Sequence, residues 1–265
     1  MRSAFFLLLF LLHLSVVRAG VIPASAALDI SFSPAFSPSV NMQFTVTGDT
    51  GIFFLKTYNG TKWILLDSAN LSKNDLLHFF EKADTATLLA LQPDPERKGF
   101  DGVILVVETS IGKQGNKLEL WSPVRARHPG VYKMLDSLFL LAYSKFPGHE
   151  KNLEDVQMYF EYGLPVKLKS ENPSVYRIFG VLSVNEQPAL QHFFDSIPND
   201  AQVIFDLSNF HGMGTLLDDD FKKFDRTHPY VVWVTPGYID NYFMNILSPA
   251  KRVETIAEAM RRLGK

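Results

Sequence analysis

The sequence contains no cysteine among its 265 residues. This absence excludes disulfide bonds, thiol nucleophiles and thiolate metal sites. Stability must therefore come from the packing of apolar side chains, which make up 46% of the residues. Domains above about 100 residues can bury a sufficient core without cross-links. The composition therefore predicts a globular protein.

The chain also lacks an excess of charge of either sign. Its formal net charge is -2 and its isoelectric point is about 6.4. It carries neither the basic field that attracts nucleic acids nor a polybasic stripe for anionic lipid. We therefore expect no nucleic-acid partner and, instead, another protein as the partner. The sequence leaves the oligomeric state open.

Several motifs of known chemistry are missing as well. The sequence has no Gly-x-Ser-x-Gly nucleophile elbow and no His-Glu-x-x-His zinc helix. The histidines show no ligand spacing. The consecutive aspartates 218–220 would point in different directions on a helix, which favours a solvated face over a cation site. We therefore expect no metal and no cofactor, and a non-catalytic protein is the first hypothesis.

The N-terminal segment has the order of an export signal. Arg2 precedes an apolar run over residues 5–12, and two small-residue cleavage patterns follow, ending at Ala19 and Ala26. The run is too short to cross a bilayer, which takes about 20 apolar residues. We therefore expect residues 1–26 to be a signal peptide that is cleaved after Ala19 or Ala26. The mature protein would be exported to the periplasm, the extracellular space or a secretory lumen, without a membrane span.

Two sequons follow the signal, at Asn59-Gly60-Thr61 and Asn70-Leu71-Ser72. In a eukaryotic secretory pathway Asn59 and Asn70 would be glycosylation sites. Such tripeptides also arise by chance, and an exported chain without cysteine favours a bacterial source, in which they would stay unmodified.

The first half of the mature chain has strand patterns followed by helical patterns. Residues 27–40 are rich in serine and proline, and Pro34 and Pro38 predict an extended lead-in without regular structure. Residues 41–168 indicate an α+β domain, because strands come first and helices last. The expected strands cover 41–47, 52–57, 62–66, 87–92, 103–109 and 117–121, and the expected helices cover 72–83, 128–146 and 152–162.

Residues 174–265 follow a different pattern, in which strands and helices alternate. The expected strands cover 175–184, 202–208, 230–235 and 252–253, and the expected helices cover 188–197, 213–224, 238–247 and 255–263. This alternation predicts an α/β domain with a mostly parallel sheet covered by helices. The polar segment 169–173 predicts the boundary between the two domains.

The second domain carries an ordered set of short motifs: VIFDLS at 203–208, GMGTLL at 212–217, VVWVT at 231–235 and VETIAEAM at 253–260. In this order they resemble the STAS domain, the family of anti-sigma-factor antagonists and of the cytoplasmic tails of sulfate transporters. The resemblance implies that family's scaffold and its protein-binding habit. The regulatory serine of the family lies just before its Gly-x-Gly turn, where this chain has Asn209, Phe210 and His211. The resemblance therefore implies binding without the phosphorylation switch.

One candidate binding site lies in the first domain, in the loop between an expected strand and an expected helix. This loop places an aromatic side chain, two guanidinium groups and an imidazole close together: Trp121, Arg125, Arg127 and His128. Arginine forks beside an aromatic wall can bind a carboxylate, a phosphate or an acidic partner. The competing interpretation is that the tryptophan ends a strand in the core while the arginines are merely solvated, and we rank it first.

A second candidate site lies at the carboxyl end of a central strand of the second domain, where open α/β sheets bind ligands. Its polar side chains are Asp206, Ser208, His211 and Thr215. One alternative function is a hydrolase or transferase that uses Asp206, Ser208 and His211. Another is a small-molecule binding protein with its site between the domains. The glycines near His211 more often mark a strand-to-helix turn with positive φ than an oxyanion loop.

Overall fold

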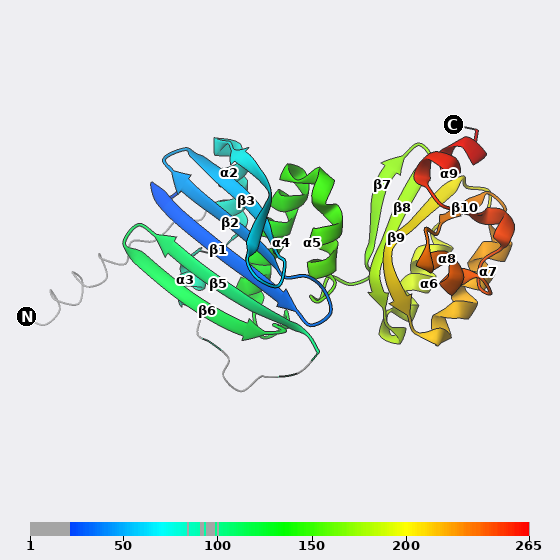
Figure 1. Ribbon diagram of the computed structural model, residues 1–265, viewed down its shortest axis with the longest axis horizontal. Helices are drawn as coiled ribbons and strands as arrows, with labels where there is room; N and C mark the ends of the chain where they lie inside the picture. Colours follow the sequence, from blue (N-terminus) through cyan, green and yellow to red (C-terminus); the bar gives the residue numbers. More distant parts are fainter. Residues whose placement is uncertain (1–21, 84, 91–92, 94–98, 100, 265) are drawn as a thin grey trace, which may run out of the picture. The chain divides into compact units, whose positions relative to one another are not determined.

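The computed structural model describes residues 22–264 except 84, 91–92, 94–98 and 100 (Figure 1). The packing divides the chain into two compact units, Met1–Val156 and Gln157–Lys265, which are described separately. Residues 1–21 of the expected signal peptide lie outside the described residues. Among the residues that are described, no helix is long and apolar enough to span a bilayer.

The first unit is built on a six-stranded sheet with the strand order β4-β3-β2-β1-β5-β6, and all neighbouring strands are antiparallel. The β2–β3 hairpin closes through Gly48 and Asp49, and Gly48 supplies the positive φ, 60°, that a two-residue hairpin loop needs. The strands are β1 Ser25–Pro34, β2 Val40–Thr47, β3 Thr50–Tyr58, β4 Trp63–Leu71, β5 Val103–Ile111 and β6 Gln114–Trp121.

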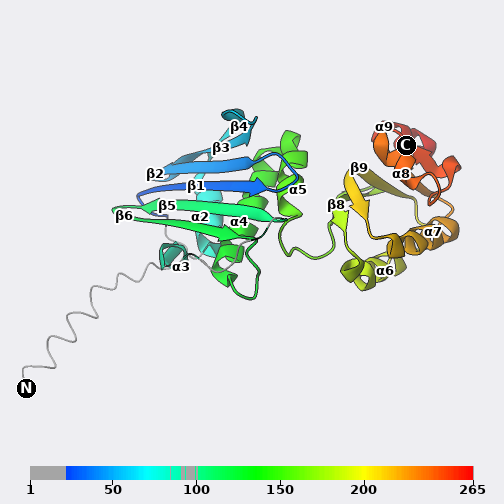
Figure 2. The ribbon, with the colours of Figure 1, turned by 60° about the horizontal axis from the view of Figure 1, so that its bottom comes forward.

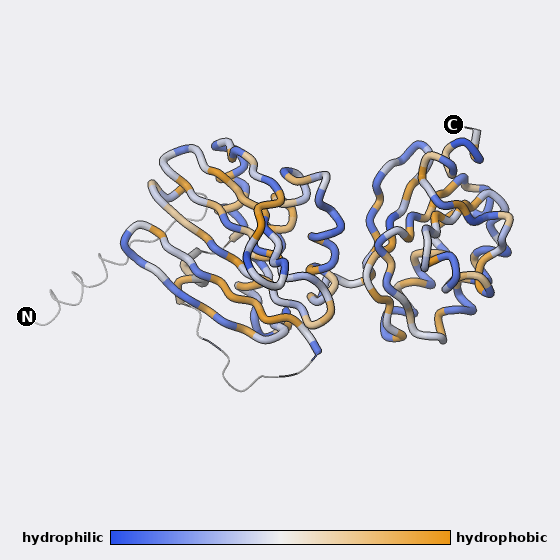
Figure 3. Tube along the Cα trace, in the orientation of Figure 1, coloured by the Kyte–Doolittle hydropathy of each residue, from blue (hydrophilic) through white to orange (hydrophobic). Residues whose placement is uncertain are grey.

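Two helices, α2 (Lys73–Lys82) and α4 (Pro129–Lys145), cover one face of this sheet. Helix α2 begins with a capping box, in which Ser72 and Asp75 each accept a hydrogen bond from the other's backbone N–H. Aromatic pairs fill the layer between sheet and helices: Phe32–Phe139, Phe44–Phe79 and Phe53–Phe146, with ring centroids 5.8, 4.8 and 4.9 Å apart. Figure 3 shows how apolar and hydrophilic segments alternate along the chain, with an apolar β5 and a hydrophilic β5–β6 turn.

Three further short helices belong to the first unit: α3 (Thr85–Ala90), η1 (Pro147–His149) and α5 (Glu150–Gln157). Helix α3 corrects the expected strand over 87–92, of which residues 91–92 lie outside the described residues. The segment Thr-Ala-Thr-Leu-Leu-Ala contains threonine and leucine, which suit a strand, but its alanines and leucines are also good helix formers. Apart from β1, the order of the remaining strands and helices in this half agrees with the prediction.

Strand β1 corrects the expected lead-in over residues 27–40. It lies between β2 and β5 in the middle of the sheet. Its side chains alternate, with Ala26, Leu28, Ile30 and Phe32 buried against the helices. Pro34 does not prevent this strand, because it is the last residue of the element.

The second unit contains a five-stranded sheet with the order β11-β10-β9-β8-β7. Strands β8 to β11 are parallel, and β7 joins the edge as an antiparallel partner of β8. The predicted mostly parallel sheet with helices is therefore confirmed. The strands are β7 Val166–Glu171, β8 Ser174–Leu182, β9 Val203–Met213, β10 Val231–Val234 and β11 Arg252–Val253.

Two features of this sheet differ from the sequence-based expectation. The predicted boundary over 169–173 falls within β7 and the β7–β8 turn, so that residues 157–168 pack with the second unit instead of the first. Strand β9 continues to Met213, well past the expected end at Ser208, because its second half pairs with the end of β8. The first point follows from the pairing of β7 with the next strand, β8, and the second from the pairing of β9 with β8, about 30 residues earlier in the chain.

Helices cover both faces of the second sheet (Figure 2). Helices α6 (Gln187–Asp195), α7 (Asp218–Thr227) and α8 (Tyr238–Phe243) pack on the face that contains Phe205 and Trp233. Helix α9 (Ile256–Arg262) packs on the opposite face, over Ile204, Val232 and Val253. The strands are therefore buried on both sides, as their apolar runs predict. The 3-10 turns are η2 Val184–Glu186, η3 Thr215–Leu217 and η4 Pro249–Lys251.

A buried polar network fixes the end of α7 to the segment that follows α8. Asp225 is buried at 4% exposure. Its carboxylate accepts hydrogen bonds from Trp233 Nε1 at 2.9 Å and from the backbone N–H of Ser248 at 3.1 Å. Lys251 Nζ lies 3.7 Å from the same carboxylate and donates to the carbonyl of His228 at 3.0 Å. The charge of Asp225 is thus compensated inside the core, as a buried carboxylate requires.

Candidate functional site

The loop after β6 holds its expected binding residues in contacts within the first unit. Arg125 forms a bidentate pair with Asp136 of α4, both hydrogen bonds measuring 3.1 Å, and its guanidinium lies 4.4 Å from the ring centre of Tyr132. Trp121 ends β6 half-buried, so close to the chain that a Cβ on Gly99 would lie 2.1 Å from its ring. Arg125 therefore joins this loop to α4, and Trp121 packs against the chain that leads into β5.

The other two residues of this loop do not complete an anion site. His128 directly precedes α4, and its Nδ1 lies 3.3 Å from the carbonyl oxygen of Val124. Arg127 is exposed to solvent. Because Arg125 already has its carboxylate, the geometry favours the interpretation that this loop stabilises the packing of α4 on the sheet.

At the second candidate site, Asp206 is a buried structural carboxylate. It lies in the middle of the sheet, opposite Arg177 on β8. Arg177 Nη1 is 3.5 Å from its Oδ2, and the backbone N–H of Ser208 donates to its Oδ1 at 3.0 Å. Both carboxylate oxygens of Asp206 therefore already have partners within the sheet.

The remaining residues of that site do not converge with Asp206. His211 is exposed on β9, and its Nε2 lies 3.4 Å from Oδ1 of Asn209. Ser208 is half-buried, and Thr215 is exposed at the start of η3. Asp206 is thus engaged with Arg177 in the sheet while His211 faces solvent. This arrangement does not build the acid–base pair that a hydrolase or transferase would need.

The turn after β9 lies at Gly214, the second glycine of the Gly-Met-Gly motif, and not at Gly212. Gly212 is part of the strand and pairs with Val181, and the chain turns at Gly214 instead. A Cβ on Gly214 would lie 2.7 Å from Cγ1 of Val184. A larger residue at position 214 would therefore force the Val184 side chain to shift, because η2 and η3 approach each other closely.

A cluster of exposed apolar side chains lies where β8 and β9 end, and we name it the carboxyl-edge surface. Its members are Val184, Leu216, Tyr238 and Tyr242, which are 43%, 66%, 62% and 39% exposed, respectively. Val184 and Leu216 flank Gly214, and the tyrosines lie on α8 beside β9. Sequence reasoning missed this surface, because tyrosines spaced i, i+4 on a helix look the same whether they face a core or solvent.

Hydrogen bonds hold both tyrosines of the carboxyl-edge surface. The hydroxyl of Tyr238 donates to the carbonyl of Phe210 at 3.0 Å. The hydroxyl of Tyr242 donates to the carbonyl of Met213 at 3.1 Å and accepts from its N–H at 3.3 Å. The rings are therefore fixed on the sheet edge before any partner arrives.

Acidic residues border the carboxyl-edge surface on the side of α7, whose first turn follows η3 directly. Asp219 is 94% exposed there, and its only ion pair among the described residues is with Lys222 at 3.8 Å. Asp220 accepts hydrogen bonds from Gln187 and Gln191 of α6, both at 2.8 Å. Within the described part of the chain, no group of acidic and histidine side chains could hold a metal ion.

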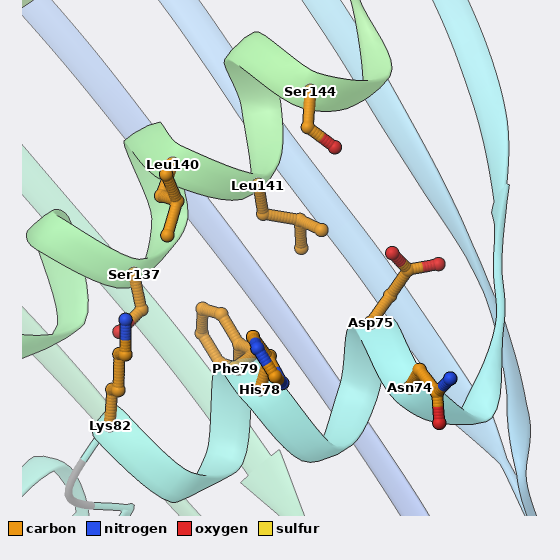
Figure 4. Close-up of a pocket in the computed structure, with 9 residues that line it drawn as sticks. All are labelled: Asn74, Asp75, His78, Phe79, Lys82, Ser137, Leu140, Leu141 and Ser144. Carbon is orange, nitrogen blue, oxygen red and sulfur yellow. The ribbon is translucent and has the colours of Figure 1, made fainter.

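A groove between α2 and α4 in the first unit has a volume of about 220 Å³ (Figure 4), and we name it the α2–α4 groove. Phe79 and Leu141 form its buried floor, and Leu140 stands beside it at 57% exposure. The other side chains that line it are polar: Asn74, Asp75, His78, Lys82 and Ser144 at the rim, and Ser137, which is buried.

One end of the α2–α4 groove is electrically neutral. Asp75 Oδ2 lies 2.7 Å from Nζ of Lys145. Burial by itself raises the pKa of Asp75, but hydrogen bonds from Lys145 and from Ser72 outweigh it and hold the pKa below its ordinary value of 3.8. Asp75 and Lys145 therefore compensate each other and also join α2 to α4.

The two sequon asparagines are both exposed in the first unit. Asn70 lies on the edge strand β4, and Asn59 lies in the β3–β4 turn, where its side chain accepts backbone N–H bonds from Thr61 and Lys62 at 3.1 and 2.9 Å. Neither position is shielded from modification.

Comparison with known proteins adds no relative to these observations. The chain matches no family model and no curated protein.

Proposed function

We propose that the protein is an exported, non-catalytic, two-domain protein that binds another protein through the carboxyl-edge surface of a STAS-like second domain. The observation that carries this proposal is the group of exposed apolar side chains at the end of β8 and β9. Large apolar side chains gathered on one exposed surface are typical of interaction sites. The parallel sheet with helices on both faces supports the STAS-like scaffold, and the N-terminal signal pattern supports export.

The fixed tyrosines make this surface suitable for binding. A tyrosine presents a large contact area, and its hydroxyl can stay hydrogen-bonded while its ring is covered. Tyr238 and Tyr242 are already held by Phe210 and Met213. Ordering a free side chain costs about 0.5–1.5 kcal/mol on binding, and most of that cost is avoided here. The tyrosines are therefore expected to be the anchors of the interface.

The charge beside the surface indicates the chemistry of the partner. The first turn of α7 places Asp218, Asp219 and Asp220 next to η3. A partner that buries Leu216 would meet these carboxylates at the rim, where complementary charge accelerates association. We therefore propose a partner segment with an apolar residue flanked by lysine or arginine.

Site-specific photo-crosslinking in the exported compartment tests the proposal. A photoreactive phenylalanine is placed at Tyr238, and a matched control carries it at Tyr230, which is 53% exposed but lies outside the surface. We expect one protein to be enriched at Tyr238 and not at Tyr230. Equal enrichment at both positions, or none at either, would contradict the proposal.

The crosslinked protein is then purified and its affinity measured. Leu216→Ser removes about 1.5 kcal/mol of apolar burial in the complex, and we expect it to raise the dissociation constant approximately ten-fold. Asp219→Asn is expected to slow association at low salt and to have little effect at high salt. An unchanged affinity of Leu216→Ser would show that the captured protein binds elsewhere.

A further inference from the structure

The α2–α4 groove has features of a ligand site that are independent of the carboxyl-edge surface. It lies in the first unit, and it combines an apolar floor with a polar rim, as small-molecule sites do. Phe79 and Leu141 form the floor, and Leu140 remains 57% exposed at its side. An apolar wall that solvent still reaches can be covered by the apolar part of a ligand.

The charge at the rim of the groove is not evenly balanced. Asp75 and Lys145 neutralise each other at one end, at 2.7 Å. At the other end, Figure 4 shows Lys82 extending along the rim toward Ser137. No ion pair involves Lys82 within the part of the chain that the structure describes, whereas Lys73 of the same helix pairs with Asp49 at 2.9 Å. The groove thus offers one uncompensated cation next to apolar walls.

The volume limits the size of the ligand. An apolar cavity of about 150 Å³ accommodates the six carbons of benzene, and the groove measures about 220 Å³. By proportion it accommodates roughly eight or nine non-hydrogen atoms, fewer than a drug-sized ligand has.

From these observations we propose that the α2–α4 groove binds a short-chain aliphatic carboxylate. The carboxylate pairs with Lys82, and the alkyl chain lies on Phe79 and Leu141 against Leu140. Hexanoate, with eight non-hydrogen atoms, has this size and charge. The amide of the same chain has the same shape without the charge, and hexylamine carries the opposite charge.

NMR titration of the full chain with methyl-labelled leucines tests the site. We expect hexanoate to shift the methyl signals of Leu140 and Leu141 with a dissociation constant on the order of 1 mM. Hexanamide is expected to bind about five-fold more weakly, since an exposed ion pair contributes up to about 1 kcal/mol. Hexylamine should bind more weakly still.

Matched variants separate this site from unspecific apolar binding. Lys82→Gln should weaken hexanoate binding about five-fold and leave hexanamide binding unchanged. Lys73→Gln, on the same helix but outside the groove, should change neither. Leu140→Ala should weaken both ligands about three-fold, whereas Leu168→Ala, which is also exposed, should not. All four positions are on the surface, so the variants should fold normally.

Three results would overturn the proposal. One is equal affinity for hexanoate and hexanamide, and another is a Lys82→Gln variant that binds hexanoate as the parent protein does. The third is the absence of saturation at about ten times the expected dissociation constant.

Discussion

Asp225 provides the sharpest test of how the second unit is held together. Replacing it by alanine removes the acceptor for Trp233 Nε1 and for the backbone N–H of Ser248, and it removes the counter-charge of Lys251. Each buried donor left without a partner costs about 1–3 kcal/mol. Removing one member of a buried ion pair costs about 3–5 kcal/mol. Because these contributions overlap, we expect Asp225→Ala to lower the free energy of unfolding by about 3–5 kcal/mol in total.

Urea unfolding followed by fluorescence measures this loss. Trp233 is the only tryptophan of the second unit, so replacing Trp63 and Trp121 by phenylalanine makes the signal specific to it. With a denaturant slope of about 1.5 kcal/mol/M, the transition midpoint should fall by about 2–3 M. A shift below about 1 kcal/mol would refute the view that Asp225 anchors this network.

Two further variants of α7 make the result interpretable. Asp225→Asn keeps one acceptor oxygen but turns an amide N–H toward the N–H of Ser248 or of Trp233, so it should also destabilise the unit, by less than the alanine variant. Asp219→Ala on the same helix is 94% exposed and should change the stability by no more than about 0.5 kcal/mol. Equal losses for Asp219→Ala and Asp225→Ala would point to a general effect of removing negative charge from α7 instead of the buried network.

Three other predictions concern different parts of the chain. Gly180 has a φ of 68°, and a Cβ there would lie 2.8 Å from Cβ of Met158, so Gly180→Ala should destabilise the second unit by about 1–3 kcal/mol in the same urea assay; no loss would contradict this. Because the folded-state pKa of Asp75 lies below 3.8, its contribution to stability is present above pH 3.8 and is lost as the pH falls through the folded-state pKa. Below pH 3.8 the free energy of unfolding should therefore fall less steeply with decreasing pH for Asp75→Asn than for the parent protein, and an unchanged pH dependence would contradict the prediction. Finally, β1 begins at Ser25, whose carbonyl accepts the N–H of Gly112 at 3.1 Å. Cleavage after Ala26 would remove the first residues of this strand, so we expect mass spectrometry of the exported protein to show cleavage after Ala19. An N-terminus at Ala27 would refute this.

Elements with a strong local pattern could be predicted from the sequence. The four apolar residues Val231–Val234 indicate a strand buried on both faces, and β10 is such a strand. Helix α4 follows from its apolar periodicity and from Pro129 at its first position. The residues of β1 also alternate strictly between apolar and polar, but Pro34 and Pro38 are equally typical of a segment without regular structure.

The candidate sites were less predictable, because a side chain's partners come from distant parts of the chain. Arg125 was a candidate ligand-binding residue, although a structural interpretation of its loop ranked first, and its carboxylate partner Asp136 lies on the next helix. Asp206 was a candidate binding residue near the expected end of a strand, yet β9 continues past it and Arg177 of β8 faces it. The carboxyl-edge surface and the α2–α4 groove depend on which face of a helix solvent reaches, and residue type alone does not fix that.

The hydroxyls of Tyr238 and Tyr242, which bind the backbone of β9, also affect the solubility of the protein. Strand β10 pairs with β9 only over Val203–Asp206, and no described strand continues that pairing toward Met213. A bare strand edge is a template for adding further strands from other molecules. By occupying backbone groups of Phe210 and Met213, Tyr238 and Tyr242 block part of this edge. The same two side chains therefore present a binding surface and protect the protein against self-association into sheets, so losing both hydroxyls would increase its tendency to aggregate.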